Sequence, residues 1–394
     1  MSAGLVQKIS RNLRRRSLPG LALLAIALAG CATLPQQSPV SDDELTWILS
    51  GADMLPASSD IEDLAALMHV TEEMRQFAQN VTRRETRTAD KTTALAAALG
   101  AKDGLHLQYD ANATLTAEEV FNQRRANCLS YTLLFVALAR EVGIPVMFNE
   151  VDVPPTWDMG DDKTLLLYKH INARVNLSRP LYQMVDVSGD EYDPRFDQRI
   201  ISDLSALAQF YNNRSVELRL QQRRAEALAY QLRALQLAPD AAYFWTNLAS
   251  LYLLNGNPLA ARVAVTRALT LDAASVPGTE TAAQIYQQLG EHHLAAYFRE
   301  RAQHFLGQNA YYHYHLALAA LNEGDERLAY NETHRAIVLY PRDARFFLLA
   351  AVLLQRLGEP KLANNCMQIV IELTQSGAQQ ERYKNKFERL TKHG

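Results

Sequence analysis

The chain has 394 residues, a formal net charge of −3 and an isoelectric point near 6.4. Because this length exceeds one ordinary domain, we expect two folded units of about 150 to 200 residues each. The charge argues against a protein that binds nucleic acid by neutralising phosphates, and it favours soluble partners or substrates.

The first 31 residues have the pattern of an export signal. Five basic residues between Lys8 and Arg16 precede an apolar stretch, Leu21–Ala29, which is too short to span a bilayer. The stretch leads into Cys31, and the sequence Leu-Ala-Gly-Cys resembles the lipobox of bacterial lipoproteins. The resemblance implies that Cys31 carries lipid and that the protein is sorted to the outer membrane. The alternative is a plain transmembrane anchor with an incidental cysteine.

A polar, proline-containing tether extends to about Val40, and three segments with helical patterns follow it. These segments are 42–49, 61–79 and 90–99. Asp60 is a candidate N-cap for the second of them. We expect these helices to form the N-terminal part of the first domain.

Cys128 stands at the start of a strongly apolar helical pattern, Leu129–Arg140. Thr116 opens a short helix before it, and a strand-like run, Val146–Val151, follows it. The free N–H groups and the positive dipole end of a helix start favour a thiolate, and the same amides can receive an oxyanion. Cys128 therefore suits a nucleophile, whereas Cys366, inside an apolar helical pattern, is typical of a small core residue.

A thiolate also needs a general acid, and His170 is the best-placed candidate. It opens an alternating, strand-like stretch, His170–Val175, and a second stretch follows at Tyr182–Val187. If the hairpin turns at Ser178, His170 lies directly opposite Asp186, with their Cβ atoms about 5 Å apart. Asp186 would then hold the imidazole in its working tautomer.

The sequence around these three residues resembles the transglutaminase-like family of the papain-like superfamily, over about 104–194. The matching blocks are Asn127–Tyr131, Ala137–Pro145, Lys169–Asn172 and Met184–Val187. The resemblance implies a papain-like α+β fold with Cys128 as nucleophile, His170 as general acid and base, and Asp186 as the orienting residue. Ala126 departs from the family pattern, which often has glycine there.

The side chain that stabilises the oxyanion is harder to assign from sequence. Papain-like enzymes use a polar amide shortly before the cysteine, and Asn122, Gln123 and Asn127 are all available. We assign Gln123 to this role. Alternatively, each of the three residues is only a helix cap or a surface amide. A metal site built from the three triad residues lacks the paired spacing typical of zinc, so we expect neither metal nor cofactor.

The C-terminal half of the chain repeats itself. Gly256, Gly290, Gly324 and Gly358 are 34 residues apart, and an alanine follows each of them five residues later. This is the period of tetratricopeptide repeats, helix pairs that bury their apolar faces only against neighbouring pairs. We expect five units over about 209–377, the first of them degenerate.

Five side chains occupy positions that face the concave groove in the repeat pattern. They are Tyr243, Thr246, Ser250, Tyr311 and Tyr314. Because such solenoids commonly bind extended peptides, these residues are candidates for a peptide groove. Alternatively, they are ordinary solvated side chains, and the array only spaces or docks the first domain.

We therefore predict an α+β papain-like, transglutaminase-like domain followed by an all-α tetratricopeptide-repeat solenoid. The expected segments are a signal peptide (1–31), a tether (32–41), an N-terminal helical part of the catalytic domain (42–103), a transglutaminase-like core (104–204), repeats (205–378) and a capping helix (379–394).

The predicted function is a lipid-anchored thiol enzyme on the outer membrane, facing the periplasm. As a peptidase, amidase or acyltransferase it would act on peptide or side-chain amides, while its repeats recruit an envelope protein. The alternative is a non-catalytic envelope scaffold whose papain-like domain binds peptides without cleaving them. Neither hypothesis involves nucleic acid. In both, the protein contacts the membrane only through the N-terminal lipid.

Overall fold

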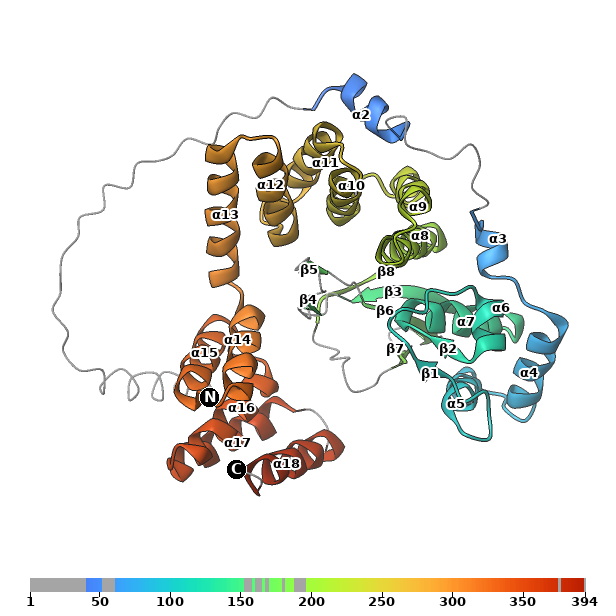
Figure 1. Cartoon of the computed structure of the whole chain (residues 1–394). Coiled ribbons are helices and arrows are strands. Elements are labelled where there is room, and N and C mark those ends of the chain that lie inside the picture. The colour runs from blue at the N-terminus through green and yellow to red at the C-terminus, as the bar shows by residue number, and fades with distance from the viewer. Residues whose placement is uncertain are drawn as a thin grey trace. The chain divides into compact units, whose positions relative to one another are not determined.

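A computed structural model of the chain describes most of its residues (Figure 1). The described ranges are 40–51, 61–151, 158–159, 165–166, 170–178, 181–187, 196–374 and 377–392. The predicted signal peptide with Cys31, and most of the predicted tether, lie outside these ranges. Within them, no helix has both the length and the apolar character that crossing a membrane requires.

The first part of the chain is helical. Its helices are α2 (Asp42–Leu49), α3 (Leu64–Leu67), α4 (Glu72–Thr82), α5 (Thr88–Gly100), α6 (Ala117–Gln123) and α7 (Cys128–Glu141). The single helix predicted over 61–79 is wrong, because two side chains cap separate helices there. Asp63 accepts a hydrogen bond from the N–H of Ala66, and Thr71 accepts one from Met74. The predicted cap Asp60 lies outside the described residues.

A four-stranded antiparallel sheet has the strand order β7-β6-β3-β8. Its strands are β3 (Val146–Val151), β6 (His170–Ser178), β7 (Leu181–Val185) and β8 (Gln198–Ile201). Two short pairs, β1 (Gln108–Tyr109) with β2 (Arg125–Ala126) and β4 (Asp158–Met159) with β5 (Leu165–Leu166), lie outside this sheet.

Helix α7 is enclosed by the rest of this part of the chain. Every residue from Leu129 to Ala139 is buried, which explains why its sequence is apolar on all sides. The hydroxyl of Thr132 lies 3.1 Å from the carbonyl oxygen of Ile171 in β6, so the helix is fixed directly to the sheet.

Helix pairs make up the rest of the described chain (Figure 1). They are α8 (Asp203–Leu220) with α9 (Arg224–Leu237), α10 (Ala242–Leu254) with α11 (Pro258–Leu271), α12 (Val276–Gln288) with α13 (His292–Gly307), α14 (Ala310–Asn322) with α15 (Glu326–Leu339), and α16 (Ala344–Arg356) with α17 (Pro360–Leu373). A last helix, α18 (Gly377–Lys392), stands where a capping helix was predicted. The alanines at positions 227, 261, 295, 329 and 363 are fully buried, as expected where paired helices approach closely.

One apolar core joins the sheet-containing part to the first helix pairs. Its buried side chains run without interruption from Ile48 through α7 and the sheet to Phe298 in α13. The hydroxyl of Tyr252 in α10 donates a hydrogen bond to the carbonyl oxygen of Ile48, which ties α2 to the second pair. The N-terminal helices and the early repeats therefore share one buried interior.

Each helix pair turns through a residue with positive φ. Gly256, Gly290, Gly324 and Gly358 have φ between 76° and 84°, and the corresponding residue of the first pair is Gln222, with φ of 63°. The residue after each turn donates its N–H to a carbonyl near the end of the preceding helix, as in the Schellman motif. Gln222 therefore adopts a conformation that suits glycine. The first unit looks degenerate in sequence because it lacks the glycine that the other four units have at this turn.

We predict that Gln222→Gly raises the free energy of unfolding by about 1 kcal/mol, because glycine adopts positive φ without the steric penalty of a side chain. Gly290→Ala should lower it by a similar amount, since an added Cβ there meets nothing within 4 Å and only φ opposes it. Urea unfolding measures both changes. The control is Gln221→Gly at φ of −79°, which should destabilise; equal losses from both glutamine variants would contradict the prediction.

Candidate active site

Cys128 is the first residue of α7, and Asn127 caps this helix. The Asn127 Oδ1 atom accepts a hydrogen bond from the N–H of Ser130 at 2.9 Å, and its Nδ2 atom donates to Thr114 Oγ1 at 2.8 Å. The Cys128 side chain is half-buried and forms no disulfide. The thiol therefore lies at the positive end of a helix whose first amide groups are ordered.

His170 connects Cys128 to Asp186. Its Nε2 atom lies 2.6 Å from Asp186 Oδ2. Together with Asp186, the Cys128 side chain is one of the groups that raise the pKa of the His170 ring. The side chains of His170 and Asp186 are only 10% and 6% exposed, so bulk water does not screen their contact. Because the carboxylate takes Nε2, the Nδ1 atom is the ring nitrogen that remains for the sulfur.

The strand register differs from the predicted one. Ala173 pairs with Val185, so continuing this register places Asp186 opposite Asn172 rather than opposite His170. The predicted turn at Ser178 is wrong, because β6 continues to Ser178 and β7 begins only at Leu181. The carboxylate reaches His170 diagonally, since residues two apart share one face of a strand.

Asn172 is a site residue for which sequence analysis gave no role. Its Nδ2 atom donates to Asp186 Oδ2 at 2.9 Å, and its Oδ1 atom accepts from Asn149 Nδ2 at 2.9 Å. Both asparagines have 0% exposed surface. Since a carboxylate only accepts, it fixes which way the Asn172 amide points, and Asn172 in turn orients Asn149. A signal was present in β6, where polar residues alternate with apolar ones.

The charge environment of His170 favours its protonated form. Burial lowers its pKa, but the hydrogen bonds to Asp186 and Cys128 and the negative charges of both outweigh burial and raise the pKa to about 10. The neighbouring Tyr131 is buried, and burial together with the charge of Asp186 raises the pKa of its hydroxyl. The site therefore holds an imidazolium at neutral pH, beside a tyrosine that stays neutral.

The structure does not bring Gln123 to the site. Its side chain is exposed at the end of α6, and its Oε1 atom accepts a hydrogen bond from Arg125 Nε at 3.2 Å. Asn127 acts as a helix cap, which was the alternative interpretation. The cap takes the N–H of Ser130, so the N–H groups of Cys128 and Leu129 remain for an oxyanion.

The three groove candidates on α10 are largely occupied within the chain. Tyr243 packs against the shared core, and burial, with the nearby charge of Glu150, raises the pKa of its hydroxyl. The Thr246 hydroxyl bonds to the carbonyl oxygen of Ala242, and the Ser250 hydroxyl bonds to that of Thr246. The prediction that these residues line an open groove is therefore not supported at α10.

The two tyrosines on α14 belong to a different cluster. The ring centroids of Tyr311 and Tyr314 each lie 5.1 Å from the ring centroid of Phe346 in α16. Both tyrosine side chains are half-buried. Among the described residues, no group of three or more His, Cys, Asp or Glu side chains is arranged to hold a metal ion.

Residues 75–159 match the family model described as the transglutaminase-like superfamily. The match contains Cys128 and ends before His170 and Asp186. The chain thus has a transglutaminase-like domain followed by tetratricopeptide-type helix pairs, which confirms the predicted fold class. No curated protein sequence matches the chain.

Several solved structures are similar to part of the chain. MamA is 18% identical, with 44% of this chain and 96% of MamA covered and a TM-score of 0.23. YrrB, described as a TPR protein with an unusual peptide-binding site, is 18% identical, with 45% and 92% covered and a TM-score of 0.24. PilF of Pseudomonas aeruginosa is 15% identical, with 49% and 90% covered and a TM-score of 0.26. The assignment of the repeats rests on the helix pairs of this chain itself.

Removing the Asn172 amide should destabilise the protein. We expect Asn172→Ala to lower the free energy of unfolding by about 1 to 3 kcal/mol, because buried polar atoms of Asp186 and Asn149 lose a partner. Urea unfolding at pH 7 measures the loss. Asn176→Ala, at an exposed position on the same face of β6, is the control and should change little; an equal loss there would refute the role given to Asn172.

The raised pKa of His170 predicts how stability depends on pH. Since its pKa in the folded protein is about 10 and its ordinary value is 6.5, the imidazolium contacts stabilise the fold fully below about pH 6.5. They are lost as the pH rises towards 10. Wild type should therefore lose more stability between pH 7 and 10 than His170→Gln does, measured by urea unfolding. Parallel losses in the two proteins would contradict the raised pKa.

Proposed function

We propose that the chain is a thiol enzyme of the transglutaminase-like class that cleaves or transfers peptide or side-chain amide bonds. The observation that carries this proposal is the His170 imidazole 2.6 Å from the Asp186 carboxylate, with Cys128 at a helix start and among the groups that raise the pKa of His170. A thiolate, a general acid and an orienting carboxylate are the groups that acyl transfer through sulfur requires.

The chemistry follows from this arrangement. The Cys128 sulfur attacks the acyl carbon of the amide, and the N–H groups at the start of α7 stabilise the oxyanion that forms. The His170 imidazolium gives its proton to the leaving amine as the C–N bond breaks, which leaves a thioester on Cys128. Water or a second amine then attacks the thioester and gives its proton to His170, and the thiolate leaves. Asp186 holds the ring in position through both steps.

Anchoring and recruitment complete the proposal. The N-terminal sequence supports export, lipid attachment at Cys31 and a position on the outer membrane that faces the periplasm. The helix pairs support recruitment of an envelope protein, for which Tyr311 and Tyr314 are the remaining groove candidates because the α10 residues are occupied. A lipid anchor and a recruiting array would together hold the enzyme close to substrates in the envelope.

A thiol-directed acyl probe tests the enzyme directly. We expect wild type to be labelled at Cys128, and Cys128→Ala to lose this label. His170→Ala should label at least about a hundredfold more slowly, and turnover by Asp186→Asn should fall about 10³- to 10⁴-fold, because the imidazole loses its orientation. Mass spectrometry locates the label, and Cys366→Ala, which removes the buried cysteine, should label like wild type.

Capture experiments identify the substrate. Because the oxygen of Cys128→Ser is a much poorer nucleophile, this variant should retain bound envelope proteins or peptides that wild type releases. If His170→Ala labels as fast as wild type, Cys128 is an ordinary exposed thiol. The protein is then a scaffold that binds peptides without cleaving them.

A further inference from the structure

Glu217 is a buried carboxylate in the first helix of the repeat array. It lies near the end of α8, and its side chain is 9% exposed. Burial raises its pKa, although hydrogen bonds from Thr114 and the charge of Arg214 oppose this effect. A buried carboxylate is costly unless polar groups surround it, so its partners indicate what it is there to hold.

The main partner of Glu217 is Thr114, which precedes it by 103 residues. The Thr114 backbone N–H donates to Glu217 Oε1 at 2.8 Å. Arg214, one turn earlier in α8, completes the set at 3.1 Å from Glu217 Oε2. The backbone of Thr114 is therefore held by a residue of the repeat array.

Thr114 is in turn the partner of the residue that caps the Cys128 helix. The Thr114 hydroxyl oxygen accepts a hydrogen bond from Asn127 Nδ2 at 2.8 Å. This contact turns the Asn127 Oδ1 atom towards the N–H of Ser130, where it caps α7. The carboxylate of Glu217 thus holds the backbone that places the Thr114 hydroxyl beside the Asn127 amide.

The segment around Thr114 has further bonds to the first turn of α7. The N–H of Asn127 donates to the carbonyl oxygen of Ala113, and the N–H of Leu115 donates to Ser130 Oγ at 2.8 Å. Thr114 and its two neighbours, Ala113 and Leu115, are all buried. A displacement of this segment would therefore move the N-terminus of α7, and with it the sulfur of Cys128.

We propose that Glu217 is a positioning residue for Cys128, which acts through Thr114 and Asn127 to orient the cap of the nucleophile's helix. This inference rests on the proposed function, because it assigns a task to a residue of the repeat array within the same site. The transglutaminase-like domain is then completed by the first repeat helix and is not an independent module.

Two other contacts of α8 fit the same arrangement. Asp203 at its start forms a two-bond ion pair with Arg140 near the end of α7, at 2.7 and 2.9 Å. Gln209 donates to Glu150 in β3, the residue next to Asn149. The helix thus contacts both the part that carries Cys128 and the strand that supports Asp186 through Asn172.

The test measures how fast iodoacetamide alkylates Cys128 in the full-length protein between pH 5 and 10, with mass spectrometry to follow the Cys128 peptide. We expect Glu217→Gln and Thr114→Val to react about tenfold more slowly near pH 6, with the rate curve displaced to higher pH, because a misoriented cap stabilises the thiolate less. The conservative Thr114→Ser keeps the hydroxyl and should restore the wild-type curve.

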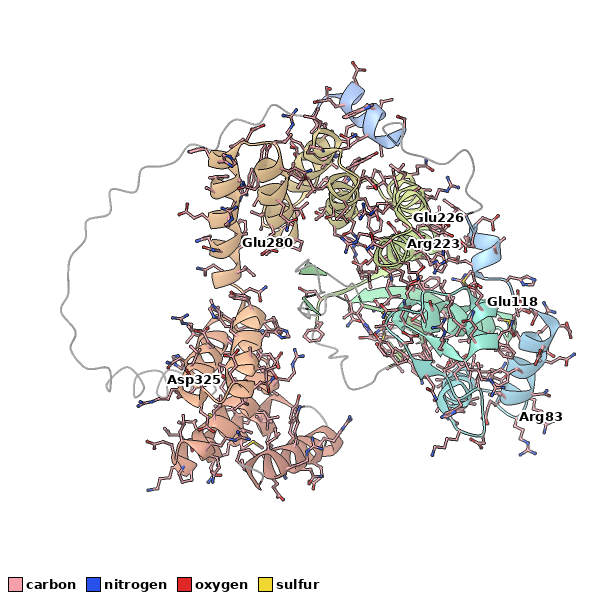
Figure 2. All side chains as sticks on the ribbon, viewed as in Figure 1. Arg83, Glu118, Arg223, Glu226, Glu280 and Asp325 are labelled. Carbon is pink, nitrogen blue, oxygen red and sulfur yellow. The ribbon has the colours of Figure 1, made fainter. Side chains whose placement is uncertain are left out.

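A matched control is Glu226→Gln, which removes a half-exposed carboxylate from the adjacent helix α9, where Arg223 is its partner (Figure 2). Its rate curve should equal that of wild type. If Glu217→Gln and Thr114→Val lose stability in urea but keep the wild-type rate curve, Glu217 is only structural and the proposal is overturned. If wild-type Cys128 itself reacts no faster than a free cysteine at every pH, the proposed function and this inference both fall.

Discussion

The buried contact between His170 and Asp186 is the constraint around which the rest of the site is built. A carboxylate that is 6% exposed needs donors, and it has the imidazole at 2.6 Å and the Asn172 amide at 2.9 Å. Because a carboxylate only accepts, its presence fixes the orientation of Asn172 and then of Asn149. The imidazole is held by a network whose members cannot turn independently, which is what a general acid and base requires.

Cys128 is held by a second series with the same logic, from another part of the chain. Glu217 accepts from the Thr114 backbone, the Thr114 hydroxyl accepts from Asn127, and Asn127 caps the helix that begins with Cys128. Since this series ends in a repeat helix, the array that would recruit a partner is physically continuous with the site that would act on it.

The sequence predicted most of the helices, the repeat period and the three proposed triad residues. Besides the single helix over 61–79, it was wrong at three further places. Gln123 was chosen by its distance from the cysteine along the chain, whereas the structure pairs it with Arg125. The hairpin turn was predicted at Ser178, whereas Ser178 is the last residue of β6 and the turn follows it. Tyr243 matched the groove pattern of a repeat in isolation, and no repeat pattern contains the Glu150 beside it.

What the sequence determined by itself is local. A glycine every 34 residues, an apolar stripe or a cysteine before an apolar helix is read from neighbours within a few turns, because dihedral preference and helix periodicity act over that range. Only the tertiary structure decided which carboxylate orients which amide. Thr114 and Glu217 are 103 residues apart, and Asn149 and Asn172 are 23 apart, so their contacts depend on how buried surfaces pack rather than on any spacing along the chain.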